Sequence, residues 1–364
     1  MRGICGFFVA LALSATLAQH VGAQLAPASG EPRIDPAVEQ ASASLSSDQI
    51  KSLEEYVRYW LGVMQNGSPE DAVRARDALI RPFDRGGSAI FLSTYSPVLS
   101  RNLVAAAGTS NPAAGLNAMI VASRLMDTGA IEVIKAGLKN SDNVSVRYWA
   151  ARAVDTLPAN LAKRDPNLKL TKSDEKAVLD ALVNAARVEQ SDHVMRQLLP
   201  GIVTLTIPDA RQAFLDLLDA RLADHAANPG LTVSPELAAM NRLYRQVVQE
   251  TYTAKASGGK INTGLLTAIA RIAYLYLSYG TQALQQPVSP ERQAELIGLV
   301  DLADSFLRFS AEQLIGSAKN FPGKPQEFNG NWSRYAAAVA QWPVILTAPP
   351  IGFPAQNLVL PEAK

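Results

Sequence analysis

Residues 142–158, DNVSVRYWAARAVDTLP, have the spacing of an amphipathic helix, and this spacing constrains the fold more than any other stretch. Counted from Val146, apolar side chains recur at intervals that place them on one side of a helix with 3.6 residues per turn. These side chains belong to Val146, Ala150, Ala153, Val154 and Leu157. Asp142 or Asn143 can cap the start of the helix, and Pro158 predicts its end.

The other side of this helix is polar. It carries Ser145, Tyr148, Arg152 and Asp155, which we expect to face solvent or a binding partner. The side chains on the apolar side are mostly small, and Ala150 and Ala153 therefore allow a neighbouring helix to approach closely. Trp149 adds bulk at the edge. This combination favours a helix packed among other helices.

The order of residues from Val146 to Val154, V-R-x-x-A-A-x-A-V, resembles the second helix of a HEAT repeat. The resemblance implies a helical repeat fold in which Arg147 bonds to a neighbouring repeat. A second helix, predicted to start at Ser191, reproduces the spacing at an offset of 48 residues. HEAT and armadillo repeats run to about 40–47 residues, so this offset with its intervening loop is compatible with a repeat. An alanine-rich helix of another helical bundle would show the same pattern.

The second match departs from the first at two positions. Met195 replaces the arginine, and Pro200 predicts a kink, because proline removes a backbone donor and crowds the preceding turn. Helical periodicity recurs in further segments, namely 69–82, 96–107, 208–226, 234–254, 262–279, 289–319 and 332–341. No segment alternates polar and apolar residues as a strand would. We therefore predict an all-α fold, an irregular α–α superhelix (HEAT- or armadillo-like) of antiparallel helix pairs, with the resemblance mainly in residues 111–205.

Composition divides the chain into four parts. Residues 1–23 have a positive start, an apolar run and a small-x-small end at Val21-Gly22-Ala23, which is typical of a cleaved signal peptide; a short membrane anchor is the alternative. Residues 24–46 are rich in alanine, serine and proline and predict a flexible linker. Residues 47–319 form the predicted helical repeat-like domain, and residues 320–364 form a proline- and aromatic-rich C-terminal tail expected along its surface.

The charge balance and the cysteine content exclude several classes of protein. Lysine plus arginine number 34 and aspartate plus glutamate 33, and loss of Arg2 with the predicted signal peptide makes the two equal. A neutral chain argues against nucleic acid as a partner and against a polybasic membrane-surface role. The single cysteine, Cys5, lies inside the predicted signal peptide. We expect an exported protein, periplasmic or extracellular, without a thiol and without a membrane span after cleavage.

Residues suited to catalysis are sparse. Outside the predicted signal peptide the chain has two histidines, His193 and His225, each preceded by an aspartate and each expected at a capping or solvent-exposed position. Asp216 and Asp219 lie three residues apart on one predicted helix and could serve hydrolysis, but a solvated face explains them better. The sequence contains no phosphate-binding loop, nucleophile elbow or dinucleotide-binding motif. We predict no catalytic residue, no metal site and no cofactor.

The leading hypothesis for function is an exported, non-catalytic helical scaffold for protein–protein interaction, since curved helix arrays offer extended surfaces to partners. In HEAT-type arrays the second helices commonly line the concave side. That resemblance places the predicted binding surface at Tyr148, Arg152, His193 and Arg196. Two alternatives stay open. One is a hydrolase acting on cell-wall or polysaccharide material. The other is a glycan-binding protein with a groove lined by Tyr274, Tyr276 and Tyr279 together with Tyr244 and Tyr252.

Overall fold

The computed structural model describes residues 30–140, 142–316 and 321–361, and all regular secondary structure in these residues is helical. The prediction of an all-α fold is confirmed. The helices all belong to one compact unit, residues 34–364. Residues 1–29, which hold the predicted signal peptide and the start of the predicted linker, lie outside the described residues.

The helices follow one another along the chain with mostly short connections. Their bounds are α1 (Pro36–Glu39), α2 (Ser47–Asn66), α3 (Pro69–Asp84), α4 (Ala89–Ala107), α5 (Pro112–Ala122), α6 (Ala130–Leu138), α7 (Val144–Arg164), α8 (Lys172–Ala186), α9 (Asp192–Thr204), α10 (Pro208–Ala227), α11 (Ser234–Ala256), α12 (Thr263–Ala283), α13 (Pro290–Ile315), α14 (Trp332–Val339) and α15 (Trp342–Thr347), with two 3-10 helices, η1 (Pro325–Phe328) and η2 (Ala355–Leu358).

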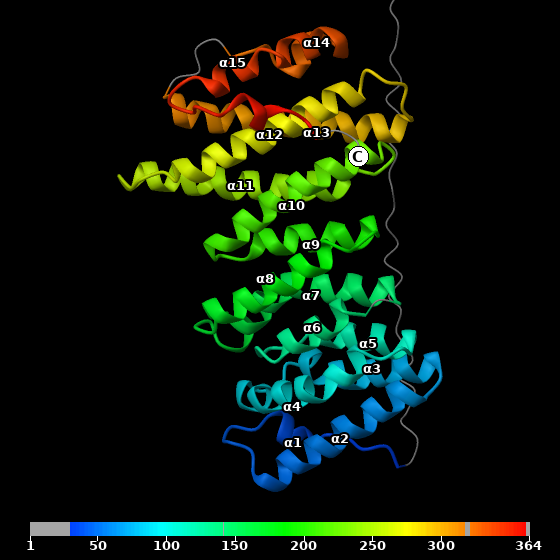
Figure 1. Cartoon of the computed structure of the whole chain (residues 1–364). Coiled ribbons are helices and arrows are strands. Elements are labelled where there is room, and N and C mark those ends of the chain that lie inside the picture. Colours follow the sequence, from blue (N-terminus) through cyan, green and yellow to red (C-terminus); the bar gives the residue numbers. More distant parts are fainter. Residues whose placement is uncertain (1–29, 141, 317–320, 362–364) are drawn as a thin grey trace, which may run out of the picture. The chain divides into compact units, whose positions relative to one another are not determined.

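From α2 onwards the helices alternate between two layers. Even-numbered helices from α2 to α14 each pack on the next even-numbered helix, and odd-numbered helices from α3 to α13 do the same. Several consecutive helices also pack as pairs, for example α2 with α3 and α6 with α7. Figure 1 shows the resulting stack of helices, one above another from α2 to α14. This arrangement is compatible with a helical repeat fold.

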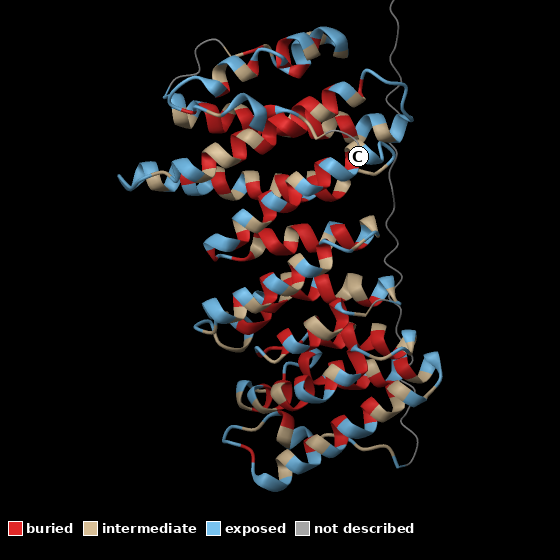
Figure 2. Cartoon of the chain, viewed as in Figure 1, coloured by how far each residue is buried: buried red, intermediate tan, exposed pale blue. Residues whose placement is uncertain are grey.

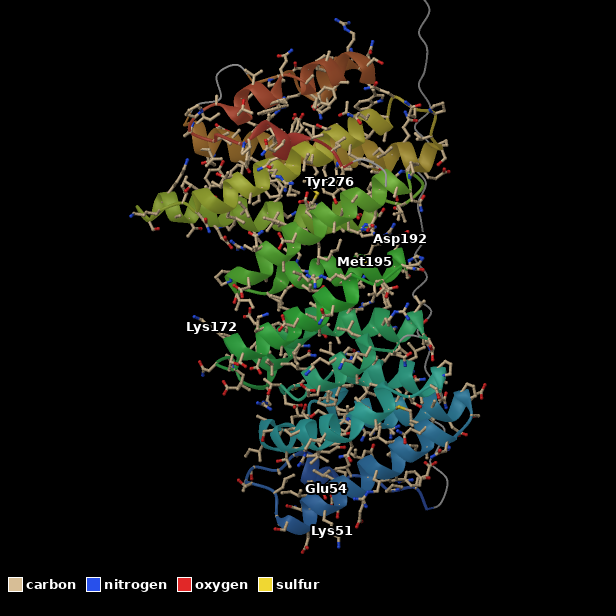
Figure 3. The ribbon with its side chains drawn as sticks, viewed as in Figure 1. Lys51, Glu54, Lys172, Asp192, Met195 and Tyr276 are labelled. Carbon is tan, nitrogen blue, oxygen red and sulfur yellow. The ribbon has the colours of Figure 1, made fainter. Side chains whose placement is uncertain are left out.

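One hydrophobic cluster runs through the stack, from Leu45 to Leu358 (Figure 2). Met195 and Tyr276 lie inside the stack, whereas Lys172 points away from it (Figure 3). In α7 the predicted apolar stripe is buried, with no side chain more than 2% exposed: Val146, Ala150, Ala153, Val154 and Leu157. The spacing of these positions thus predicted the buried side of α7 correctly.

Prolines end helices less often than predicted. Four of them lie inside described helices, at Pro82, Pro97, Pro158 and Pro200. A proline in a helix interior removes a backbone hydrogen bond and costs about 3 kcal/mol. In α7 the residues beyond Pro158 offset this cost, because Leu161 is buried and the Asn160 amide donates to the Ser123 carbonyl at 2.8 Å. The predictions that helices end at Pro82 and Pro158 are therefore wrong.

Part of the predicted flexible linker packs on the helical body. α1 contacts α4, where the Ser88 N–H donates to the Glu39 carbonyl at 2.8 Å and the Ser88 hydroxyl donates to the Ala41 carbonyl at 2.7 Å. Ser88 also caps α4, so that this helix begins before the predicted position near Ser96. The prediction of a flexible linker is wrong for residues 35–46.

Gly280 allows α12 and α13 to approach closely. A Cβ atom added at this position would lie 2.8 Å from Val300 Cγ2, closer than side chains pack. The prediction that the helix ends after Tyr279 is wrong, because the glycine serves helix packing and α12 continues beyond it. α13 instead ends at a glycine, Gly316, whose φ of +83° gives a left-handed cap. The last residues of the predicted helix, 317–319, lie outside the described part of the chain.

The proline-rich tail contributes to the core. Trp342 and Tyr335 are fully buried, and the Tyr335 hydroxyl donates to Asp304 Oδ1 at 3.1 Å. The Arg308 guanidinium lies 5.6 Å from the centre of the Trp342 ring. The expectation that the tail only follows the surface is corrected, because its aromatic side chains enter the stack beside α12 and α13.

Replacing Gly280 with alanine should lower the free energy of unfolding by about 1–2 kcal/mol, because the new methyl group overpacks the contact with α13. Gly62, in the middle of α2, is the matched control, since a Cβ atom there would meet nothing within 4 Å. Gly62→Ala should stabilise the protein by up to about 1 kcal/mol, because alanine favours helix. Urea unfolding of both variants measures the difference. Equal effects would contradict the assigned close contact.

Candidate functional site

The predicted binding surface lies on α7 and α9, which pack against each other in the odd-numbered layer. Arg152 is exposed, and its guanidinium lies 4.9 Å from the centre of the Trp149 ring. Tyr148 is half-buried and meets Trp149 edge-on, with 6.1 Å between ring centres. His193 and Arg196 are exposed on α9. All four predicted residues are therefore at least partly accessible, on helices that are neighbours.

Asp155 of α7 is only partly exposed to solvent. Asp155 accepts a hydrogen bond from the Thr204 hydroxyl at 2.9 Å and another from Arg242 Nη1 at 3.0 Å. Because Thr204 belongs to α9 and Arg242 to α11, the carboxylate links three helices of one layer. The expectation that Asp155 faces solvent or a partner holds only in part, because its side chain is 32% exposed and also bonds to two neighbouring helices.

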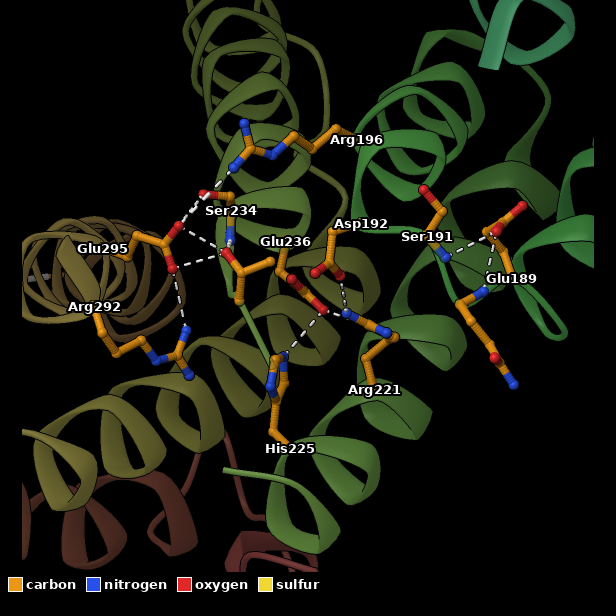
Figure 4. A network of polar contacts seen from close by, with 12 residues as sticks. Glu189, Ser191, Asp192, Arg196, Arg221, His225, Ser234, Glu236, Arg292 and Glu295 are labelled. Carbon is orange, nitrogen blue, oxygen red and sulfur yellow. Dashed lines mark hydrogen bonds and ion pairs between the residues drawn. The ribbon is translucent and has the colours of Figure 1, made fainter. Parts of the chain in front are cut away.

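Arg147 forms the bond to a neighbouring helix pair that the HEAT resemblance implied. Its Nε and Nη2 atoms donate to the two carboxylate oxygens of Glu189, at 2.7 and 3.1 Å, and its Nη1 donates to the Asn140 carbonyl at 3.1 Å. Glu189 lies in the turn between α8 and α9, and it also accepts from the Ser191 N–H at 2.8 Å (Figure 4). This bidentate ion pair thus holds α7 to the turn before α9.

A buried charged cluster lies where α9, α10 and the first turn of α11 meet (Figure 4). It consists of Asp192, Arg221, His225 and Glu236. Arg221 Nε donates to Glu236 Oε1 at 2.6 Å, and His225 Nε2 lies 3.1 Å from the same oxygen. Asp192 Oδ1 lies 3.8 Å from Arg221 Nη2, an ion-pair distance that is too long for a hydrogen bond. Glu236 and His225 are 0% exposed, whereas the Asp192 side chain is 34% exposed, so only the inner part of the cluster is closed from solvent.

Each member of the charged cluster also has a buried polar atom without a hydrogen-bond partner. These atoms are Asp192 Oδ1, Arg221 Nη2, His225 Nδ1 and Glu236 Oε2. Leaving buried polar atoms unpaired costs free energy. The surrounding apolar contacts must therefore hold these four side chains in place.

For each of the two carboxylates of the cluster, burial raises the pKa and neighbouring positive charges lower it. Desolvation alone would raise the pKa of Glu236, but hydrogen bonds and charges from His225 and Arg221 outweigh it, and the pKa lies below its usual range. For Asp192 desolvation prevails, so its pKa is raised although the Arg221 charge opposes this. Glu236 is thus the ionised partner of Arg221, and Asp192 is the more readily protonated carboxylate.

The charged cluster joins two consecutive helices that do not pack closely along their lengths, α10 and α11. Arg221 and His225 belong to α10, and Glu236 belongs to the first turn of α11. The ionic contact therefore holds the start of α11 at a place where the regular pairing of consecutive helices is interrupted.

A polar network around Glu295 of α13 continues from the charged cluster (Figure 4). The His225 ring lies 5.2 Å from the Tyr279 ring, whose hydroxyl accepts from Arg292 Nη2 at 3.0 Å. Arg292 Nη1 donates to Glu295 at 3.2 Å, and Arg196 lies 3.9 Å from Glu295. Two hydroxyls near the start of α11 also donate to Glu295, those of Thr232 and Ser234. Arg196, a residue of the predicted binding surface, thus lies at the solvent-exposed end of this network.

The prediction that His225 caps a helix or faces solvent is wrong. The sequence held one signal of its burial, because Arg221 and His225 fall on the side of α10 that carries Phe214 and Leu218, both buried. A polar pair on an apolar stripe requires a polar partner inside the protein. Glu236, the partner, comes from the next helix, and nothing in the local sequence identified it.

The tyrosines suggested for a glycan-binding groove are mostly inside the stack. Tyr274 and Tyr276 are buried, and Tyr279 is half-buried. The Tyr276 hydroxyl donates to the Leu218 carbonyl at 2.9 Å. These three side chains therefore do not line a groove together. The other two tyrosines of the suggested groove, Tyr244 and Tyr252, are half-buried and exposed, and both line a groove beside α13.

In residues 30–140, 142–316 and 321–361, no three His, Cys, Asp or Glu side chains come together in a way that would hold a metal ion. The helices in this described part of the chain also fall short of the length and apolarity that a bilayer span requires. The chain matches no protein-family model, no curated protein and no solved structure. The HEAT-like pattern of residues 142–158 is therefore a resemblance without a family match.

Replacing Glu236 with glutamine should destabilise the protein by about 3–5 kcal/mol near neutral pH, because Arg221 would stay buried without its counter-charge. The pKa of Glu236 is lower in the folded than in the unfolded protein. Its contribution is therefore fully present above the usual value of 4.5 and is lost as the pH falls through the folded value. The difference between the variant and the wild type should shrink in that acid range, as measured by urea unfolding at several pH values.

Asp192→Asn is the control for this prediction. Because the pKa of Asp192 is raised, its charge does not favour the folded state, and the amide should be tolerated with a change below about 1 kcal/mol. A Glu236→Gln protein as stable as the wild type near neutral pH would show that the charged cluster does not hold α10 to α11.

Proposed function

We propose that this protein is an exported, non-catalytic scaffold that binds a protein partner on the exposed side of α7 and α9. We name this surface the α7–α9 face, consisting of Tyr148, Arg152, His193 and Arg196. The observation that supports the proposal is the packing of α7 against α9 within one layer, with the four side chains at least partly exposed on these two neighbouring helices.

We further infer that the two layers form a HEAT- or armadillo-like superhelix. The alternation of helices between layers supports this inference, as does the bond from Arg147 to Glu189 in the next helix pair. Arrays of this kind present extended surfaces to their partners. A binding surface built from successive helices follows directly from such an arrangement.

The side chains of the α7–α9 face suit recognition of a protein. Tyrosine and arginine are over-represented at the energetic centres of interfaces, because each combines a large contact area with hydrogen bonding. Arg152 already lies over the Trp149 ring, so that binding would cost it less conformational entropy. The bonds of Arg147 and Asp155 hold the two helices beneath the face in fixed positions.

The hydrolase alternative has weaker support. Its best candidate acid and base, Glu236 and His225, are 0% exposed. A general acid or base must come within hydrogen-bond reach of its substrate. In this fold a substrate would reach these two groups only if α10 and α11 moved apart.

Alanine at all four positions of the α7–α9 face should abolish capture of the partner from the native exported fraction, using the tagged chain as bait. The matched control carries alanine at four exposed residues of α2, namely Lys51, Glu55, Arg58 and Tyr59. Like Tyr148, Tyr59 meets a neighbouring tryptophan edge-on. The control should capture the partner as the wild type does. Unchanged capture by the α7–α9 variant, with its fold intact by circular dichroism, would refute this surface.

Export requires that residues 1–23 act as a signal peptide. Mass spectrometry of the protein recovered from the extracytoplasmic fraction should give a mature chain that begins at Gln24. Recovery of the chain only inside cells, with residues 1–23 retained, would contradict export while leaving the binding proposal to its own test.

A further inference from the structure

A groove of about 980 Å³ opens between successive helix pairs, where α6, α7 and α8 meet the turn before α9. One wall is a stripe of small residues on α8, namely Ala177, Ala181 and Ala185. The other wall is the end of α6, with Lys135, Leu138 and Lys139. The groove contains none of the four residues of the α7–α9 face, so it is a separate surface.

Exposed apolar side chains mark this groove. Val188 is 79% exposed and Val144 is 44% exposed, and both line it. Clustered exposed apolar groups, unlike single ones, are typical of interaction sites. Covering these valines would remove apolar surface from water and so favour binding.

The spacing of the alanine stripe fits a helical partner. Residues 177, 181 and 185 recur every four positions, so they lie on one line along α8 that spans about 12 Å. A partner helix presents its own anchors at about the same spacing over two turns. Small side chains on the receiving helix allow the two backbones to approach closely.

The charges at the rim select the chemistry of that partner. Lys135 and Lys139 stand four residues apart on the α6 wall, and Lys139 is exposed. On the α8 wall, Asp180 is already paired with Lys176 on its own helix. Lys135 is likewise paired with Glu132, and exposed pairs such as these two contribute little. The rim therefore carries two lysines on the α6 wall against one aspartate on the α8 wall. The α6 wall therefore favours acidic groups.

The floor of the groove is rigid. Arg147 and Glu189 line it and are bonded to each other by two hydrogen bonds, and Glu189 also fixes the Ser191 N–H. This ion pair ties α7 to the turn before α9, and the helices of the two walls, α6 and α8, pack directly on each other, so the groove is formed without a partner present. A preformed groove costs a ligand less free energy than one that must open.

We infer that this groove binds an amphipathic helix of a partner protein, with the apolar side of that helix on the alanine stripe and an acidic edge against Lys135 and Lys139. The inference goes beyond the proposed function, because it names a second surface and the chemistry of its occupant. It can fail while the α7–α9 face holds, since the variants that test the two surfaces do not overlap.

The test uses two helical peptides of about 15 residues, each with leucines along one side. One peptide carries glutamates along one edge and glutamines along the other, and the second carries lysines in place of the glutamates. Fluorescence anisotropy with the full chain should show tighter binding of the glutamate peptide. Val188→Asp should weaken that binding about tenfold or more, since the apolar contact is lost. Val344→Asp, at a valine that is 74% exposed on α15, is the matched control and should have no effect.

Charge reversal provides the second arm of the test. Lys139→Glu should remove the preference for the glutamate peptide or invert it. Lys172→Glu, at an exposed lysine at the other end of α8, should leave the preference unchanged (Figure 3). Failure of both peptides to bind would overturn the inference, as would binding that is insensitive to Val188→Asp. Self-association of the chain that disappears in Val188→Asp, measured by sedimentation, would assign the groove to a second copy instead.

Discussion

Contact between the apolar sides of successive helices is the interaction on which both layers depend, because each helix buries its stripe only against its neighbours. The contacts are close where one side contributes a small residue. A Cβ atom on Gly137 of α6 would lie 2.9 Å from the Ala150 Cβ of α7, and Gly280 makes the equivalent approach to α13. Stability in such an array is roughly a sum of nearest-neighbour contributions. A weakened contact therefore affects the adjoining helices before it affects the rest.

Apolar contact alone does not fix the register of one helix against the next, because it has little directionality. Polar bonds between helix pairs supply that register here. Arg147 reaches Glu189, and Asp155 joins α7 to α9 and α11. The buried Glu175 of α8 accepts from the Thr206 and Ile207 N–H groups at 2.6 and 3.0 Å, and so holds the start of α10. Each bond connects residues that are far apart in the sequence and that only the fold brings together.

This division explains what could be predicted from the sequence. The stripe of α7 follows from local periodicity, and the all-α class follows from its repetition. The bond of Arg147 came from a family resemblance rather than from spacing. The errors at Pro158, Gly280 and His225 share one cause, because a partner distant in sequence decides each case. In the second match Met195 occupies the position of Arg147, and it is 0% exposed. The position that forms a polar bond in α7 is therefore a core position in α9.

The charged cluster adds two fully buried ionisable side chains, His225 and Glu236, to the polar bonds between helices, and its place in the stack accounts for it. The pair α8 and α9 before it and the pair α12 and α13 after it pack closely, but α10 and α11 do not. The attraction of Arg221 for Glu236 replaces apolar contact at this point, against the cost of desolvating both charges. An apolar contact is indifferent to protonation, whereas this one depends on an ionised carboxylate. The connection between α10 and α11 therefore weakens in acid, when Glu236 becomes protonated.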